Sequence, residues 1–557
     1  MKSIFWSNTD TFEDKKERLK GIIKKRGIIF SHESPIISPE GWRQEWLFDM
    51  RRVLLMPEAL NLATDIFWER FEKEYPFQVG GQEIAAVPLI TAIALKGAKL
   101  RKPVNAFIIR KSRKPVGLQK IIEGELNNEK VILVDDLINY GQNKQHQLAV
   151  LEEYNKRVSY VFTLVNFRDA ASYHFLRDRK ITLVSLFSLQ DFGLILEENN
   201  FRGTTPDKFE IVWKFKCPNP NLFYVLPKSS PCLDNERIYF GSDSGIFWAL
   251  SQKDGSVIWK FITKPNRQGK GIFSSPALLD DTVFFGAYDG NVYALDTATG
   301  QPKWVFGEAD WIGSSPALAK EENLLFMGLE YGRPQKNGGV VALDFKTGEK
   351  RWEYFMSEYV HCSPVYCREK DVVAVGGNDS CVYLFDAKTG RLKWKFETDG
   401  EVKASLAFSS QRNLLFFGSF DHQLYALDID TGEASFKIKT GDRIYSTPLI
   451  LNDTLYFTSL DKMLYALDLK DKAPKWKFLT NGRVFSSPAL IDGRIVFGSN
   501  DGAMYEIDAY TGILIGFFQA AERITNKIVY NPDSKRYFLT TYANEVFCLK
   551  KAEQSKN

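Results

Sequence analysis

The chain has 557 residues, which is too long for one hydrophobic core, so we expect at least two domains. Its formal net charge of +4 is small for this length, and it gives no overall indication of a nucleic-acid or membrane partner. We find neither the apolar core of a signal peptide nor the roughly 18 uninterrupted apolar residues of a spanning helix, and therefore expect a cytoplasmic protein.

The residues that most often bind metals are scattered along the chain. The six cysteines show no CxxC spacing and the five histidines are dispersed. This distribution favours reduced, packed thiols, and we expect no metal site built from protein ligands alone.

The first part of the chain, residues 1–205, has the pattern of an α/β domain. It opens with the basic segment KKERLKGIIKKR, which we interpret as the exposed face of a helix and only secondarily as a nucleic-acid contact. Further on, helical patterns such as NLATDIFWERFEKEY alternate with the apolar runs VNAFII, VILV, YVFTLV and ITLVSLF. That alternation predicts a parallel sheet flanked by helices.

Two adjacent acids follow the apolar run VILV. Asp135 and Asp136 stand where this strand is expected to end, and the loop NYGQN leads from them to an amphipathic helix. In a parallel sheet, ligands bind beyond the carboxyl ends of the strands. Two carboxylates suit the hydroxyls of a sugar, and N–H groups at a helix start suit a phosphate, so a ribose 5-phosphate fits this segment. The structural alternative is that the acids cap the helix.

Three further segments of the N-terminal part contain charged or glycine-containing motifs. They are WLFDMRRVLLMP with Asp49 and Arg51, VGGQEIAAVPLITAIAL from Val79, and the basic FIIRKSRKPVGLQKIIEG that ends at Gly124. Together with VDDLINYGQN, these segments resemble, in family order, the motifs of type I phosphoribosyltransferases, and most closely those of orotate phosphoribosyltransferase. The resemblance implies the fold of that family for the N-terminal domain.

The resemblance also implies a role for each matched residue. Asp135 and Asp136 would bind the ribose hydroxyls of 5-phosphoribosyl 1-pyrophosphate (PRPP), with Mg²⁺ balancing the charge of the departing pyrophosphate. The basic loop usually serves the neighbouring subunit, which implies a homodimer. The implied 5′-phosphate contacts are Asn139, Tyr140, Gly141, Gln142 and Asn143. The implied pyrophosphate contacts are Arg110, Lys111 and Lys114 of the basic loop and Gly81, Glu83, Ala85 and Ala86 of the pyrophosphate loop, and the implied base contacts are Arg51 and Arg168.

The same motifs depart from the family pattern at several positions. Asn139 and Asn143 replace hydroxyl residues, and Ala85 and Ala86 replace a glycine pair. Val116 stands where the family often has His or Tyr, and Arg168 is displaced from the expected Asp-Arg order. Two hypotheses follow. The first is a Mg²⁺-dependent transferase acting on PRPP and a base-like acceptor, and the second is a catalytically weakened PRPP or nucleotide sensor in a stress or defence pathway.

The remainder, residues 206–557, is a series of β-repeats. The unit SSPALLDDTVFFGAYDGNVYALDTATGQPKWVF recurs with a period near forty residues, which predicts a β-propeller with four strands per blade. Seven copies are complete and the eighth lacks its last strand, whereas KFEIVWKF stands alone before the first copy. We predict that this first strand pairs with the last three and closes an eight-bladed ring.

The repeat resembles that of the PQQ-repeat superfamily, which includes quinoprotein dehydrogenases and a bacterial outer-membrane assembly factor. The resemblance implies the propeller fold, but we do not expect PQQ itself, because the chain shows neither a signal sequence nor an acidic calcium-binding cluster. A propeller in this setting favours a protein-interaction scaffold. The insertion LEYGRPQKNGG in the third copy is a candidate contact loop.

Overall fold

The structure is a computed structural model that describes residues 10–31, 45–113, 119–195, 207–222, 229–265, 269–332 and 336–552. The chain divides into two compact units, one of residues 1–200 with 519–521 and the other of residues 201–518 with 522–557. We describe each unit by itself. The domain boundary between residues 205 and 206 stays a prediction.

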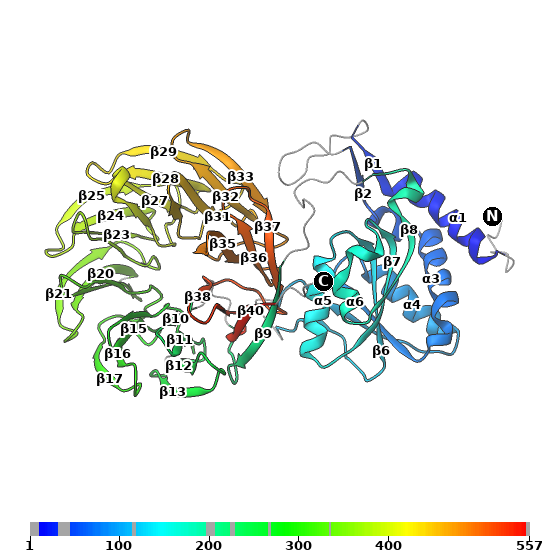
Figure 1. The fold of residues 1–557 in the computed structure, drawn as a ribbon, viewed down its shortest axis with the longest axis horizontal. Helices are drawn as coiled ribbons and strands as arrows, with labels where there is room; N and C mark the ends of the chain where they lie inside the picture. Colours follow the sequence, from blue (N-terminus) through cyan, green and yellow to red (C-terminus); the bar gives the residue numbers. More distant parts are fainter. Residues whose placement is uncertain are drawn as a thin grey trace. The chain divides into compact units, whose positions relative to one another are not determined.

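The N-terminal unit is built on a six-stranded sheet of order β5-β4-β3-β6-β7-β8, in which β5 is antiparallel to β4 and the other neighbours are parallel. Helices α3 and α4 lie on one side of this sheet and α5 and α6 on the other (Figure 1). A separate two-stranded ribbon pairs β1 with β2. The strands are β1 (Ile28–Phe30), β2 (Trp46–Phe48), β3 (Phe77–Gln82), β4 (Asn105–Ile109), β5 (Ile122–Glu123), β6 (Lys130–Ile138), β7 (Val158–Asn166) and β8 (Thr182–Ser188). The helices are α1 (Phe12–Ile22), α2 (Arg51–Leu54), α3 (Pro57–Phe71), α4 (Val87–Lys99), α5 (Gln142–Glu153) and α6 (His174–Asp178).

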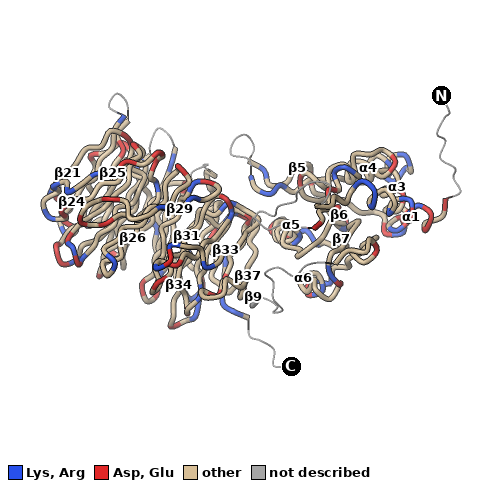
Figure 2. Tube along the Cα trace, turned by 90° about the horizontal axis from the view of Figure 1, so that it is seen from above, with Lys and Arg blue, Asp and Glu red and all other residues tan. Residues whose placement is uncertain are grey.

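The pattern of apolar residues explains this arrangement. The run VILV in β6 is fully buried, because helices cover both faces of the sheet at this strand. The basic N-terminal segment is helical, as predicted, and its exposed residues include Arg18, which pairs with Glu58 at 3.0 Å. Basic and acidic positions are interspersed along the trace of each unit (Figure 2). Within the part of the chain that the structure describes, no helix combines the length and apolar character needed to span a membrane.

The C-terminal unit is the predicted eight-bladed propeller, with four antiparallel strands in each blade. The first four blades are β10 (Cys232–Leu233), β11 (Arg237–Gly241), β12 (Ile246–Ser251) and β13 (Val257–Ile262); β14 (Ala277–Leu279), β15 (Thr282–Gly286), β16 (Val292–Asp296) and β17 (Pro302–Phe306); β18 (Ala317–Ala319), β19 (Leu324–Tyr331), β20 (Asn337–Asp344) and β21 (Lys350–Met356); and β22 (Val365–Cys367), β23 (Val372–Gly376), β24 (Cys381–Asp386) and β25 (Leu392–Glu397). The next three are β26 (Ala407–Ser409), β27 (Leu414–Gly418), β28 (Gln423–Asp428) and β29 (Ala434–Lys439); β30 (Leu449–Leu451), β31 (Thr454–Thr458), β32 (Met463–Asp468) and β33 (Ala473–Leu479); and β34 (Ala489–Ile491), β35 (Arg494–Gly498), β36 (Ala503–Asp508) and β37 (Leu514–Gln519).

The eighth blade confirms the predicted closure of the ring. Its strands β38 (Val529–Asn531), β39 (Arg536–Thr540) and β40 (Glu545–Lys551) come from the end of the repeats, and β9 (Asp207–Lys216) comes from their beginning. β9 pairs with β40 in antiparallel fashion over Phe209 to Lys216. Because the first strand completes the last blade, neither end of the repeat series leaves an open sheet edge. The insertion in the third copy lengthens the hairpin of β19 and β20 to eight residues in each strand.

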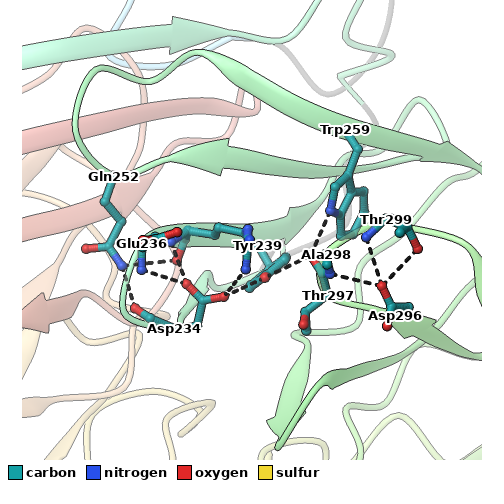
Figure 3. Close-up of polar contacts among 10 residues, drawn as sticks. Asp234, Glu236, Tyr239, Gln252, Trp259, Asp296, Thr297, Ala298 and Thr299 are labelled. Carbon is teal, nitrogen blue, oxygen red and sulfur yellow. Dashed lines mark hydrogen bonds and ion pairs between the residues drawn. The ribbon is translucent and has the colours of Figure 1, made fainter.

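A tryptophan on the outer strand of a blade joins it to the next blade. Trp259 donates its indole N–H to the carbonyl oxygen of Thr297 at 2.9 Å, at the turn that Asp296 stabilises by accepting from the N–H groups of Ala298 and Thr299 (Figure 3). The turn glycine Gly300 has φ +70 and lies against the Trp259 ring. The same arrangement recurs for the pairs Trp213 and Gly255, Trp304 and Gly348, Trp352 and Gly390, Trp394 and Gly432, and Trp476 and Gly512.

The two copies that lack this tryptophan also lack the matching glycine. Phe436 replaces the tryptophan of the fifth blade, and the turn it faces has Lys472 in place of glycine, with the Lys472 ammonium 5.4 Å from the Phe436 ring centre. Gly516 replaces the tryptophan of the seventh blade, and Lys535 occupies the corresponding turn position with φ +52. A β-carbon is therefore present at the turn only where no indole ring lies over it.

This contact predicts that Gly348→Ala destabilises the propeller by about 2–4 kcal/mol, because alanine is strained at positive φ and its methyl would overlap the Trp304 ring. A Cβ at this position would lie 2.7 Å from that ring. Gly493→Ala is the matched control, since Gly493 has φ +75 and nothing within 4 Å of an added Cβ, and we expect a loss of only about 1 kcal/mol there. Denaturant titration of both variants measures the difference, and equal losses would contradict the role of the ring.

Candidate functional site

Three of the four motif segments and the loop of Arg168 meet at one edge of the N-terminal sheet, whereas the segment with Asp49 and Arg51 lies in β2 and α2, outside this sheet. β3, β4, β6 and β7 are parallel and end at Gln82, Ile109, Ile138 and Asn166. The loops after these ends contain Glu83, Ala85 and Ala86 of the pyrophosphate loop, the basic Arg110 and Lys111, the loop Asn139–Gly141, and Arg168, whereas Gly81 lies within β3. Carboxyl ends of parallel strands share one edge, which is where such sheets bind ligands. Lys114 and Val116 lie outside the described residues.

The two acids lie inside β6 and not beyond its end. The strand continues to Ile138 because β7 extends the ladder as far as Ile138 opposite Asn166. Asp135 is 8% exposed, and its Oδ1 accepts the N–H of Asp136 at 3.0 Å. Asp136 is half-buried, and its Oδ1 accepts the N–H of Leu137 at 2.8 Å. The two neighbouring carboxylates therefore have different environments.

Lys144 is a site residue that sequence reasoning missed. It is 1% exposed and forms a buried ion pair with Asp135, and it also donates to Gln147 Oε1 at 3.2 Å. Its ammonium group balances the charge of Asp135 in this interior. The signal was present in the helix pattern, because Lys144 precedes the buried Leu148 and Leu151 by four and seven residues, on the face that turns inward.

Among the described residues, no cation forms an ion pair with Asp136. Burial, followed by the charge of the neighbouring Asp135, raises the pKa of Asp136 to about 7. A carboxyl with a pKa near neutrality at a strand end is a candidate for ligand binding or proton exchange.

The predicted phosphate loop is short and turns directly into a helix. Gly141 has φ +78, and α5 begins immediately after it, so that Gln142 and Asn143 belong to the first helical turn. The turn needs glycine, since a Cβ at Gly141 would lie 2.5 Å from the Phe175 ring. Tyr173 holds the loop from the side by donating its hydroxyl to the carbonyl oxygen of Ile138 at 3.1 Å. Free N–H groups at the start of a helix suit an anion.

The pyrophosphate loop and the basic loop contact each other. Glu83 accepts from the backbone N–H of Lys111 at 3.2 Å and lies 3.2 Å from the guanidinium of Arg110. Gly81 is packed inside β3, where a Cβ would lie 2.4 Å from the carbonyl oxygen of Val134. Ala86 is fully buried in the core, so the added methyl that could limit the approach of a ligand is that of the half-buried Ala85.

The two predicted base-binding arginines have different surroundings. Arg51 has a 71% exposed side chain and pairs with Asp49 at 3.1 Å. Arg168 lies with its guanidinium carbon 4.0 Å from the centre of the Tyr140 ring, beside the phosphate loop. The preceding Phe167 packs against Trp46 and Phe48 of β2, with ring centres 6.0 and 5.5 Å apart. In the segment NFRD, Phe167 therefore packs into the core and the next residue, Arg168, lies against Tyr140.

No group of three or more His, Cys, Asp or Glu residues able to hold a metal ion occurs among the residues described. The oxygen atoms of Asp136 are hard ligands of the kind that Mg²⁺ prefers, but they are too few to hold the ion alone.

Relatives of known function match the N-terminal part of the chain. It is 28% identical over 177 residues to orotate phosphoribosyltransferase of Aquifex aeolicus, a match that covers 32% of this chain and 96% of the relative. It is 32% identical over 161 residues to the orotate phosphoribosyltransferase of Pyrococcus abyssi, which covers 28% of this chain and 84% of the relative. In this part, the chain belongs to the orotate phosphoribosyltransferase family. The family assignment agrees with the resemblance inferred from the four motifs.

The propeller matches other proteins. Residues 336–557 match the family model described as the β-propeller of beta-alanine-activating enzyme, and residues 210–378 match that of outer membrane protein assembly factor BamB. The structure of quinohemoprotein alcohol dehydrogenase from Comamonas testosteroni has a TM-score of 0.51 at 13% identity, covering 63% of this chain and 78% of that one. The corresponding Pseudomonas putida HK5 enzyme has a TM-score of 0.51 at 16% identity, covering 62% of this chain and 77% of that one. At these identities the likeness shows the fold alone.

Proposed function

We propose that the N-terminal unit of this orotate phosphoribosyltransferase relative binds PRPP with Mg²⁺ and transfers its phosphoribosyl group to a base-like acceptor. The single observation that carries the proposal is the convergence of three motif segments and the loop of Arg168 at the carboxyl edge of one parallel sheet. In this reaction the bond from ribose C1 to pyrophosphate breaks as a nitrogen of the acceptor attacks C1. The positive charge that develops on the sugar has to be stabilised by the protein.

Each residue has a role in this proposal. The ionised Asp136 accepts hydrogen bonds from the ribose hydroxyls. Asp135 pairs with Lys144 and so links β6 to α5, the helix whose start binds the phosphate. Backbone N–H groups at the start of α5 bind the 5′-phosphate, together with Asn139, Tyr140 and the helix residues Gln142 and Asn143. Arg110 and Lys111 bind the departing pyrophosphate. To do so, Arg110 leaves its ion pair with Glu83 and bonds to phosphate oxygens instead. When bound with PRPP, Mg²⁺ would neutralise charge on the pyrophosphate, and Asp136 would offer it a carboxylate oxygen.

The proposal is tested by titrating PRPP and Mg²⁺ into the full chain, followed by assays of pyrophosphate release with a panel of bases that includes orotate. The Asp135→Asn/Asp136→Asn variant, with Lys144→Met added so that no buried charge is left without its partner, is the control for the site. We expect binding by the wild type, loss of binding in the variant, and release with at least one base. Binding without release would identify a PRPP sensor, and no binding would refute both readings.

The raised pKa of Asp136 predicts that PRPP binds more tightly as the pH rises. With a pKa of about 7, roughly one tenth of the free protein has ionised Asp136 at pH 6 and roughly nine tenths at pH 8, so affinity should rise about tenfold across this interval. The ionised carboxylate accepts hydrogen bonds from the ribose hydroxyls, whereas the protonated one loses charge-assisted bonding. Calorimetric titrations at both pH values measure the effect. The phosphates of PRPP also titrate, and the Asp136→Asn variant measures how much of the pH dependence of the affinity comes from them. If the variant shows the same pH dependence as the wild type, Asp136 is not its cause.

We further propose that the unit acts as a homodimer and that the propeller serves as a scaffold for a protein partner. The first proposal follows from the family, whose basic loop serves a neighbouring site. Light scattering at micromolar concentration tests it, since a monomer at all concentrations would refute it. The propeller proposal is motivated by its closed, rigid ring of blades, which presents loops in fixed positions.

A further inference from the structure

No group among the described residues balances the charge of Arg168. Its Nε and Nη2 atoms are shielded from solvent and have no hydrogen-bond partner within these residues. No acidic residue within the described ranges forms an ion pair with it. Buried guanidinium N–H groups without acceptors raise the free energy of the folded protein, because they lose their hydrogen bonds to water and form none within the protein. An arginine kept in this state indicates that an anion from outside the chain completes its environment.

The surroundings of Arg168 hold its guanidinium in place. The Tyr140 ring lies 4.0 Å from the guanidinium carbon, a distance at which the two planes attract each other. The Asn166 side chain donates to the carbonyl oxygen of Arg168 at 2.9 Å, and the N–H of Phe167 donates to the carbonyl oxygen of Ile138 at 2.9 Å. These bonds tie the loop after β7 to the end of β6. Arg168 is therefore fixed beside the loop Asn139–Gly141 and is not a mobile surface cation.

The neighbouring groups suit a phosphate. Tyr140 leads directly into Gly141 and the first turn of α5, whose N–H groups favour an anion. Asn139 Oδ1 is likewise shielded and has no hydrogen-bond partner among the described residues. Rotating the side-chain amide by half a turn would present its NH₂ group in place of the oxygen. The acids of β6 do not neutralise Arg168, since Asp135 pairs with Lys144 and Asp136 forms no ion pair with Arg168 within the ranges that the structure describes. The planar fork of arginine can donate two parallel hydrogen bonds to phosphate oxygens.

The geometry points to Arg168, stacked on Tyr140, as a phosphate-binding residue that replaces the hydroxyl donors absent at Asn139 and Asn143. This assignment deepens the proposed function and rests on it for the identity of the natural ligand, a phosphate monoester of ribose. It differs from the base-binding role that the family resemblance implied for Arg168. Arg168 thus contributes to the affinity for the phosphate and not to recognition of the acceptor base.

The test uses two probes that separate the phosphate from the base. Ribose 5-phosphate and orotate are titrated separately into the full chain by calorimetry, for the wild type, Arg168→Gln, Arg168→Lys and Tyr140→Leu. We expect Arg168→Gln to weaken ribose 5-phosphate binding about 10- to 100-fold, as for the loss of charged hydrogen bonds. Arg168→Lys should recover part of this loss by keeping the charge, and Tyr140→Leu should weaken binding by a smaller factor. Arg179→Gln is the matched control, because Arg179 pairs with Glu152 at the surface at 2.7 Å, and it should leave the affinity unchanged.

The outcomes distinguish this assignment from the proposed function. Loss of orotate binding with unchanged ribose 5-phosphate binding in Arg168→Gln would overturn the assignment and restore the base-binding role. Failure of the wild type to bind ribose 5-phosphate at all would also overturn it. Arg168-dependent binding of ribose 5-phosphate by a protein that neither binds PRPP productively nor releases pyrophosphate would uphold the phosphate site while the transferase function failed. Hydrogen exchange of the N-terminal amides checks that each variant retains its fold.

Discussion

Lys144→Met is expected to destabilise the N-terminal unit by about 3–5 kcal/mol, because it leaves the charge of Asp135 buried without its cation. Asp135 and Lys144 are 8% and 1% exposed, so water cannot take over the role of the ammonium group. Methionine has a similar volume and adds no clash, which limits the change to the lost ion pair. Hydrogen exchange of the N-terminal amides in the full chain measures the loss of stability in this unit alone.

A double variant separates charge from packing. Asp135→Asn/Lys144→Met removes both charges and should recover most of the lost stability, since neutral replacements of a buried pair are often tolerated. Lys96→Met is a suitable control, because Lys96 pairs with Asp65 on the partly exposed surface of α4, where an ion pair contributes about 0–1 kcal/mol. A loss from Lys144→Met no larger than that of the control would show that the buried pair does not stabilise the unit.

Trp213→Ala is expected to destabilise the propeller by about 3–5 kcal/mol, the usual range for removing a large buried aromatic ring. Trp213 lies on β9, is 8% exposed, and donates its indole N–H to the carbonyl oxygen of Gln252 at 3.0 Å. It also covers Gly255 of the first blade, while β9 itself completes the eighth blade. The ring therefore joins the two blades at which the propeller closes, and its loss should favour opening at that point.

Ile211 offers a matched control on the same strand. It is 51% exposed, so Ile211→Ala should cost less than about 1 kcal/mol. Denaturant unfolding followed by hydrogen exchange of the β40 and β10 amides compares the two variants. Equal, small effects would mean that the backbone pairing of β9 with β40 closes the ring without help from the indole.

Much of the propeller could be predicted from its repeats. The interval near forty residues, the Asp-x-x-Thr-Gly turns and the surplus strand KFEIVWKF together predicted eight blades and their closure, and the structure confirms both. These features could be read because each blade repeats the same local chemistry and packs on its neighbours. The absence of glycine at Lys472 and Lys535 could have been linked to Phe436 and Gly516 in advance, but only with knowledge of which blade each turn faces.

The candidate site was predictable as a set of segments and less so as a set of contacts. The order of the motifs placed Asp135, the pyrophosphate loop, the basic loop and Arg168 at strand ends, because parallel strands bring their carboxyl ends to one edge. The length of β6 was not predictable, since the ladder with β7 carries the strand through both acids to Ile138.

By itself, the sequence determined the fold class of both units, the closure of the ring and the family of the N-terminal part, since these depend on periodic patterns and short motifs. Only the tertiary structure decided which charges are balanced. Lys144 neutralises Asp135, and Glu83 pairs with Arg110. Arg168 stacks on Tyr140, and two of its nitrogens have no partner within the part of the chain that the structure describes. Such pairings depend on the register of strands and the rotation of helices, which bring together residues that are distant in the chain. Ion pairs and hydrogen-bond donors without partners are consequences of that packing, so the local sequence gives little indication of them.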